Sequence, residues 1–191
     1  MRKINAALFI TLDGVVEAPG AGDTTLPEKR GWSMPFMNDE VGQVIGAGMA
    51  TSDAMLLGRK TYQDFAAFWP NVPEDDPFGG MMNNQTKYVV STTLDKAEWK
   101  NSHLIKGNVT EELNKLKQNP GKDINIVGSG TLVRSLLKSD VVDELQLMLC
   151  PVVLGVGKRL FDSADFTKSM KVLEAKSFGS GMIYLRLQPE K

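Results

Sequence analysis

The sequence predicts an α/β protein whose sheet is largely parallel and ends in an antiparallel edge. Strand-like and helix-like segments alternate from residue 4 to residue 138, whereas the last third carries strand-like segments around a glycine-rich connection at 178–181. Such alternation is typical of parallel strands joined by helices, and two strands around a short turn are typical of a hairpin. The 191 residues, 42% hydrophobic and 24% charged, fit one globular domain over 1–191.

The N-terminal half begins with the apolar run Ile4–Thr11, which predicts a central strand covered on both faces. The run follows Met1-Arg2-Lys3 and so faintly resembles a signal peptide, but Asp13-Gly14 ends it without a cleavage pattern of small residues. Apolar periodicity then predicts a helix over 36–50, a strand over 54–57, a helix over 59–69 and a strand over 87–91. The Gly- and Pro-rich stretches 13–35 and 70–86 are expected to be loops.

The second half opens with a short strand-like piece at 103–105. Asn108 with Glu111 forms a capping-box pattern, which predicts a helix to about Gln118. The remaining expected elements are a strand over 124–127, a helix over 131–138, a strand over 144–153 and hairpin strands over 171–175 and 182–187. The last third is therefore expected to be mostly antiparallel.

Charge and cysteine content exclude several classes of function. The formal net charge is −1, which argues against a strong non-specific grip on nucleic acid or an anionic membrane. One cysteine, Cys150, and one histidine, His103, cannot build the usual zinc cluster, so no metal site is expected. No apolar stretch is long enough to span a bilayer. We expect a cytoplasmic protein whose partner is a small molecule.

Two strand-to-helix turns carry the clearest chemical signal, Gly58-Arg59-Lys60-Thr61 and Gly128-Ser129-Gly130-Thr131. Each opens a helix whose free N–H groups and positive dipole end attract phosphate, so two such turns could hold a pyrophosphate between them. The alternative is that each glycine only makes a tight turn after a strand. The classical dinucleotide fingerprint is absent, because the second turn lacks a third glycine and comes late in the chain.

Cationic and hydroxyl groups follow other strands of the expected parallel sheet. Arg59 lies in the first turn, and Ser91 and Thr92 follow the third strand. Ligands bind at the carboxyl ends of the strands in open α/β sheets, where these groups would suit the 2′-phosphate of NADPH. A charge-assisted hydrogen bond contributes about 1.5–3 kcal/mol, which is a preference over NADH of roughly tenfold to hundredfold.

Five motifs in order carry a resemblance to a known family. They are the first strand running into Thr11-Leu12-Asp13-Gly14, the segment Leu56–Tyr62, the segment Tyr88–Thr92, the segment Ile126–Leu132, and Asp143-Glu144-Leu145 through Pro151–Lys158. Together they resemble the dihydrofolate-reductase-like superfamily, most closely the reductase domain of bacterial riboflavin biosynthesis and its stand-alone relatives. The resemblance implies a three-layer α/β/α sandwich and a homodimer.

The resemblance also implies roles for the residues of the turns. The 2′-phosphate side of NADPH would be held by Gly58, Arg59, Thr61, Ser91 and Thr92. The pyrophosphate would be held by Gly128, Ser129, Gly130 and Thr131. Ser129 stands where dihydrofolate reductase usually has glycine, which is a departure from the family's pattern.

Candidate catalytic and substrate-binding residues lie in or beside the expected loops. Asp13 ends the first strand beside the expected nicotinamide and is the candidate proton donor, although Asp-Gly is also ordinary turn chemistry. Asp39 lies where dihydrofolate reductases carry an acidic substrate residue, although a solvated first-turn carboxylate would equally favour the helix dipole. Phe36 could cover a flat heterocycle or fasten its loop to the core. Gly157 could line the substrate pocket or only form a turn.

These observations predict an NADPH-dependent reductase that transfers hydride to a C=N or C=O bond of a small heterocyclic or sugar-linked substrate. The specific version implied by the resemblance is reduction of 5-amino-6-(5-phosphoribosylamino)uracil. The alternatives are dihydrofolate reduction, a nucleotide-binding module without turnover, and a metal-dependent phosphate hydrolase.

Overall fold

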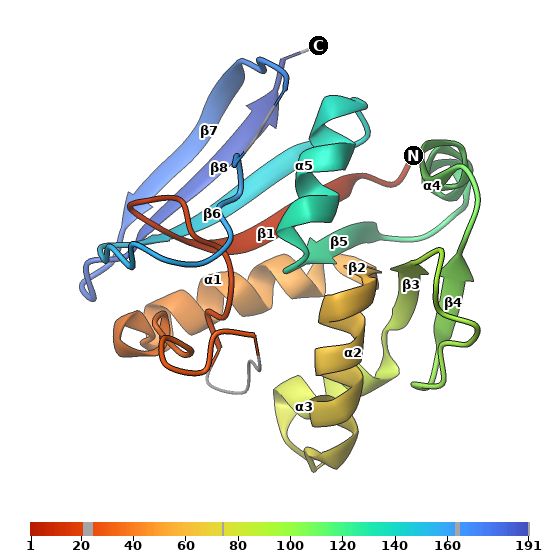
Figure 1. Ribbon diagram of the computed structural model, residues 1–191, viewed down its shortest axis with the longest axis horizontal. Helices are drawn as coiled ribbons and strands as arrows, with labels where there is room; N and C mark the ends of the chain where they lie inside the picture. The colour runs from red at the N-terminus through yellow and green to blue at the C-terminus, as the bar shows by residue number, and fades with distance from the viewer. Residues whose placement is uncertain (21–24, 74, 163–164, 191) are drawn as a thin grey trace.

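The computed structural model describes residues 1–20, 25–73, 75–162 and 165–190 (Figure 1). Eight strands, five α-helices and two short 3₁₀-helices, Met34–Phe36 and Trp69–Asn71, make up the regular elements in the described residues. The strands are β1 (Ile4–Thr11), β2 (Ser52–Gly58), β3 (Thr86–Val90), β4 (Ser102–Ile105), β5 (Asp123–Val127), β6 (Glu144–Cys150), β7 (Met170–Ser177) and β8 (Ile183–Pro189). The helices are α1 (Asp39–Ala50), α2 (Arg59–Phe68), α3 (Pro77–Asn84), α4 (Val109–Gln118) and α5 (Gly130–Lys138).

The strands form one sheet in the order β4-β3-β2-β5-β1-β6-β8-β7. Each neighbouring pair from β4 to β6 is parallel, and the pairs β6–β8 and β8–β7 are antiparallel. The predicted fold class, a largely parallel α/β sheet with an antiparallel C-terminal hairpin, is confirmed. The last third is mostly antiparallel, as expected: β6 pairs in parallel with β1 along one edge, and its other edge begins the antiparallel part of the sheet with β8 and β7.

Helices cover both faces of the sheet, which gives the expected three layers (Figure 1). On one face, α4 and α5 bury Leu113, Val133 and Leu136 against apolar side chains of the central strands. On the other face, α1 packs on β1, β6 and β8, while α2 and α3 pack on β2 and β3. The central strand β1 contributes to the cores of both faces, which explains why its sequence is apolar almost throughout.

The segment expected to be a loop over 70–86 contains α3, so that prediction was wrong. The side chain of Asp76 caps this helix by accepting a hydrogen bond of 2.7 Å from the backbone N–H of Gly79. Proline is well tolerated in the first turn of a helix, where its missing N–H would have no partner. The Pro and Gly residues that indicated a loop therefore mark the start of a short helix.

The helix expected over 36–50 begins later, at Asp39. Asn38 caps it by accepting a hydrogen bond from the backbone N–H of Val41 at 3.0 Å. Met34–Phe36 form a separate turn of 3₁₀-helix. The capping pattern at Asn108 is confirmed, since its side chain accepts from the N–H of Glu111. None of the helices in the described part of the chain is long and apolar enough to cross a membrane.

Candidate functional site

A cleft of about 770 Å³ opens at the carboxyl ends of β2, β3 and β5, between α1 and α2. It is lined by seven of the residues predicted to bind the cofactor: Gly58, Arg59, Thr61, Gly128, Ser129, Gly130 and Thr131. Carboxyl ends of parallel strands meet at one edge of a sheet, which is why two turns about 70 residues apart reach the same cleft. The two turns meet because β2 and β5, the strands that precede them, are parallel neighbours in the sheet.

The side chain of Ser129 joins the two turns directly. Its Oγ accepts a hydrogen bond from the backbone N–H of Gly58 at 2.9 Å and lies 2.9 Å from Thr61 Oγ1, to which it donates. Because α2 starts at Arg59 and α5 starts at Gly130, the positive ends of both helix dipoles meet at this junction. The arrangement can attract a ligand with two linked phosphates.

The backbone of the second turn depends on glycine. Gly128 and Ser129 both have left-handed backbone conformations, with φ of 59° and 56°. A Cβ atom at Gly130 would lie 2.7 Å from Val16 Cγ2, and one at Gly128 would lie 3.1 Å from Thr61 Cγ2. A Cβ at position 130 would therefore clash with Val16, and glycine at position 128 suits both the left-handed backbone and the closeness of Thr61. Ser129 also adopts the left-handed conformation, and its hydroxyl makes the two hydrogen bonds that join the turns.

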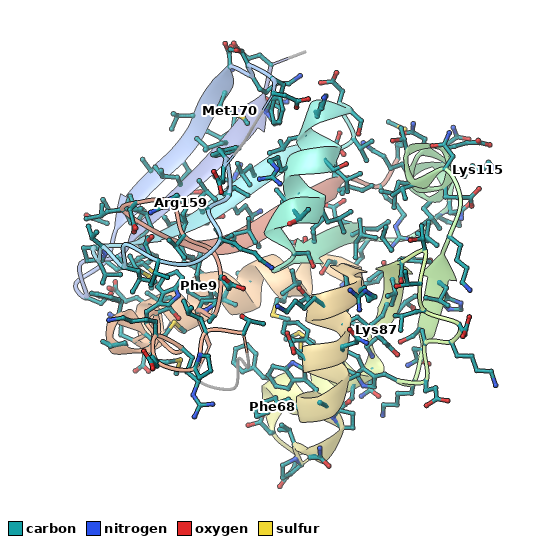
Figure 2. All side chains as sticks on the ribbon, viewed as in Figure 1. Phe9, Phe68, Lys87, Lys115, Arg159 and Met170 are labelled. Carbon is teal, nitrogen blue, oxygen red and sulfur yellow. The ribbon has the colours of Figure 1, made fainter. Side chains whose placement is uncertain are left out.

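Among the described residues, the cleft is lined by cations from two segments of the chain. Arg59 and Lys60 are exposed in the first turn of α2, where Arg59 Nη1 lies 3.3 Å from Gln63 Oε1. Lys158 and Arg159 line the cleft from the segment that follows β6, and Arg159 is labelled in Figure 2. Arg59 thus brings an exposed cation to the lining of the cleft beside the first turn.

Ser91 and Thr92 do not line the cleft, in contrast to the expectation that they hold a phosphate. The Ser91 side chain is buried, and its Oγ accepts hydrogen bonds from the N–H groups of Thr93 at 3.2 Å and Leu94 at 3.0 Å. The hydroxyl thus closes the turn after β3. Val90, the last residue of β3, lines the cleft in their place.

Asp13 also lies outside the residues that line the cleft. Its carboxylate accepts hydrogen bonds from Thr11 Oγ1 at 2.6 Å, from the N–H of Gly155 at 2.9 Å and from the N–H of Leu154 at 3.2 Å. Arg159 Nη2 completes the set at 3.4 Å. These hydrogen bonds, that of Thr11 foremost, hold the pKa of Asp13 far below its usual range. A carboxylate kept charged is a poor proton donor, and here it ties the end of β1 to the segment after β6.

The three residues expected to bind substrate are likewise outside the lining. Phe36 is half-buried and packs against the apolar cluster beneath α1, and Asp39 is exposed in the first turn of that helix. Gly157 has a φ of 110°, and a Cβ there would lie 2.8 Å from Val15 Cγ1. In the described structure, Phe36 thus packs its segment onto the core, and none of the three residues lines the cleft.

Side chains on the face of the sheet complete the cleft and were missed at the level of sequence. Phe9 on β1 (Figure 2), Gln146 and Met148 on β6, and Tyr184 on β8 all line it. Alternate residues of a strand point to the same face, so period-2 patterning of β1 and β6 could have identified the first three. Burial raises the pKa of Tyr184 to about 12, with Glu144 and Glu174 adding to the effect, so its hydroxyl stays protonated at neutral pH. No cluster of three potential metal ligands is present among the described residues.

Comparison with known proteins agrees with this geometry. A model of the family described as the RibD C-terminal domain matches residues 2–184. YyaP, an uncharacterized protein of Bacillus subtilis, is 30% identical over 188 residues, which cover 96% of this chain and 93% of YyaP. A putative riboflavin biosynthesis protein from Shewanella superposes with a TM-score of 0.78 at 19% identity, over 99% of both chains. Dihydrofolate reductase from Enterococcus faecalis, complexed with NADP(H), superposes with a TM-score of 0.63 at 15% identity, over 99% of this chain and 97% of that one. The chain therefore belongs to the RibD C-terminal domain family, and its fold is dihydrofolate-reductase-like.

Proposed function

We propose that this protein is an NADPH-dependent reductase that transfers hydride to a C=N or C=O bond of a small organic substrate. The observation that carries the proposal is the junction at Ser129, where the N-termini of α2 and α5 meet at the base of one cleft. Family membership supports a reductase role, and the similar fold of a dihydrofolate reductase complexed with NADP(H) supports the choice of cofactor.

The residues of the chain fit this cofactor. The N–H groups at the start of α5, at Gly130 and Thr131, would donate hydrogen bonds to the pyrophosphate. Glycine at position 130, where a Cβ would lie 2.7 Å from Val16, leaves only backbone at that point. Arg59, exposed in the first turn of α2 and part of the cleft lining, would pair with the 2′-phosphate. NADPH would supply the hydride, and the chain's task is to orient the nicotinamide and keep water away from it. Apolar side chains such as Phe9 and Met148 line the cleft for that purpose.

The reaction implied by the family resemblance is reduction of a ribosylamino-pyrimidine, and dihydrofolate reduction is the alternative. We also propose that the protein works as a homodimer in the cytoplasm. The long edge strand β7 is exposed along most of its length and is a candidate contact between subunits. Sedimentation velocity at several concentrations tests the dimer, and a single monomeric species throughout would contradict it.

Titration with NADPH and NADH tests the cofactor assignment. We expect Arg59→Ala to weaken NADPH binding by roughly tenfold to hundredfold, because one charge-assisted bond to the 2′-phosphate is worth about 1.5–3 kcal/mol, and to leave NADH binding nearly unchanged. Arg30→Ala is the matched control, since Arg30 is exposed and lies outside the cleft lining. Equal losses for both nucleotides would refute the role of Arg59, and no binding of either nucleotide to the unaltered protein would refute the reductase proposal.

A further inference from the structure

One buried tyrosine in the lining of the cleft has an unused hydroxyl. Tyr184 on β8 is 7% exposed and lines the cleft. Its hydroxyl makes no hydrogen bond within the described part of the chain, and the oxygen is not fully enclosed by protein. Oη is therefore the accessible atom of an otherwise buried side chain, and it is available to a molecule that enters the cleft.

Comparable polar side chains of this protein have partners. Tyr62, which is 4% exposed, accepts a hydrogen bond of 3.0 Å from a backbone N–H through its hydroxyl. The other two polar side chains that the sheet contributes to the cleft are also engaged, since Asn125 donates to Ser52 Oγ at 3.0 Å and Gln146 donates to Glu144 Oε1 at 2.9 Å. The hydroxyl of a buried tyrosine normally finds a partner. For Tyr184, that partner has to come from a bound molecule.

Tyr184 ends a row of side chains that crosses three neighbouring strands. Phe9 on β1 pairs with Met148 on β6, Met148 pairs with Tyr184 on β8, and all three line the cleft. Two strand spacings, about 10 Å, separate the ends of the row, which is wide enough for a ligand of two fused rings. Val44 and Ile45 of α1 line the same cleft and pack against the same apolar cluster. The row therefore offers a flat ring an apolar floor with a hydroxyl at one end.

The strand that carries Tyr184 lies away from the two glycine turns. The turns follow β2 and β5, whereas β8 is separated from β5 by β1 and β6. With neighbouring strands about 4.8 Å apart, β8 lies about 14 Å across the sheet from β5. A phosphate held at the turns therefore leaves Tyr184 for a different part of the bound molecules.

The Tyr184 hydroxyl is suited to donate a hydrogen bond. Burial foremost, and then the carboxylates of Glu144 and Glu174, raise the pKa of Tyr184 to about 12. The hydroxyl therefore keeps its proton at neutral pH and can donate to a carbonyl oxygen or an imine nitrogen. Donation to such an atom stabilises the negative charge that develops there when a hydride is added to the adjoining carbon.

Resting on the proposed function, we infer that Tyr184 binds the substrate by donating a hydrogen bond from Oη to the heteroatom of the C=N or C=O group that is reduced. The substrate ring lies on Phe9 and Met148, and the heteroatom faces β8. Tyr184 thus supplies the polar group at the reacting bond that the sequence led us to expect from Asp13, whose carboxylate is engaged by its own hydrogen bonds outside the cleft lining.

Two neutral probes with the same pair of fused rings test this inference by NMR titration. Quinazolin-4-one contains a C=O and a C=N group, and naphthalene has no heteroatom. We expect Tyr184→Phe to weaken quinazolin-4-one binding roughly three- to tenfold, the worth of one uncharged hydrogen bond, and to leave naphthalene binding unchanged. Tyr88→Phe is the matched control, because it removes a hydroxyl from a residue outside the cleft lining. Equal effects on both probes, or no binding of quinazolin-4-one to the unaltered protein, would overturn the inference.

Urea unfolding separates a binding role from a structural one. Because the Tyr184 hydroxyl makes no hydrogen bond within the described part of the protein, Tyr184→Phe should leave the unfolding midpoint unchanged. A clearly lower midpoint would show that the hydroxyl stabilises the fold and would overturn the binding role.

Labelling the tyrosine Cζ atoms with carbon-13 gives a measurement on the unaltered protein. The chain has three tyrosines, so the Tyr184 signal is identified by its absence from Tyr184→Phe. We expect quinazolin-4-one to shift this signal, and an unmoved signal would overturn the inference. A shift of the same size with NADP⁺ alone would assign the hydroxyl to the cofactor and overturn it as well. NADPH binding is titrated separately, so a protein that binds quinazolin-4-one through Tyr184 without binding NADPH would refute the proposed function alone.

Discussion

Replacement of Ser129 by alanine should loosen the junction on which the proposed cofactor site depends. Ser129→Ala removes two hydrogen bonds of 2.9 Å, one from the N–H of Gly58 and one to Thr61 Oγ1. At about 0.5–1.5 kcal/mol each, the loss is about 1–3 kcal/mol of unfolding free energy. With a urea m-value of about 2 kcal/mol per molar, the midpoint of urea unfolding should fall by roughly 1 M. NADPH affinity should fall as well, because the two turns are no longer held together.

Thr61→Ala, made alone and together with Ser129→Ala, shows how much of this loss comes from the bond between the two hydroxyls. Thr61→Ala removes only the bond between hydroxyls and should cost about half as much, and its cost should shrink in the Ser129→Ala background because the partner is already gone. Ser139→Ala is the control, since the Ser139 hydroxyl bonds only to carbonyls of its own helix, at 3.2 and 3.4 Å. An unchanged urea midpoint and unchanged NADPH affinity in Ser129→Ala would refute the reasoning. Additive costs of the two changes would show that the hydroxyls do not interact.

Three further predictions concern packing and buried charge. Gly130→Ala should cost about 1–3 kcal/mol by overpacking against Val16 and should be partly rescued by Val16→Ala, whereas Gly107→Ala, with open space around its Cβ, should be neutral in urea unfolding. Lys87 on β3 (Figure 2) is fully buried, and desolvation lowers its pKa from 10.5 to about 8, so the unfolded state binds more protons between these values. The free energy of unfolding should therefore rise with pH between about 8 and 10.5, and Lys87→Met should abolish this rise. A rise of equal size in the variant would show that other groups cause it. The pKa of Asp13 is lowered in the fold, so its carboxylate should stabilise the fold above the unfolded pKa of about 3.8 and lose that contribution as the pH falls further. Asp13→Asn should therefore lower the melting temperature at pH 7 and leave NADPH binding unchanged. Loss of NADPH binding in this variant would indicate a direct role of Asp13 in the cleft.

Local patterns were sufficient to predict most elements and the two turns. Burial on both faces makes a strand such as β1 continuously apolar, and a helix that packs on one side repeats its apolar residues every three or four positions. Such signals involve neighbours in sequence. They failed at α3, where a Pro–Gly composition that ordinarily breaks helices coincides with a capped helix start.

The sequence by itself determined the α/β class, the order of its strands and of its helices other than α3, and the two glycine turns as phosphate-binding candidates. Only the tertiary structure decided which side chains meet in the cleft. Ser129 and Gly58 are 71 residues apart, and their contact depends on the neighbouring positions of β2 and β5 in the sheet. Asp13 and Ser91 carry groups suited to catalysis or phosphate binding, but the fold surrounds them with backbone N–H groups that occupy those same oxygens. A carboxylate or hydroxyl has the same chemistry wherever it stands in a sequence, and its hydrogen-bond partners, set by chain folding, decide what remains for a ligand.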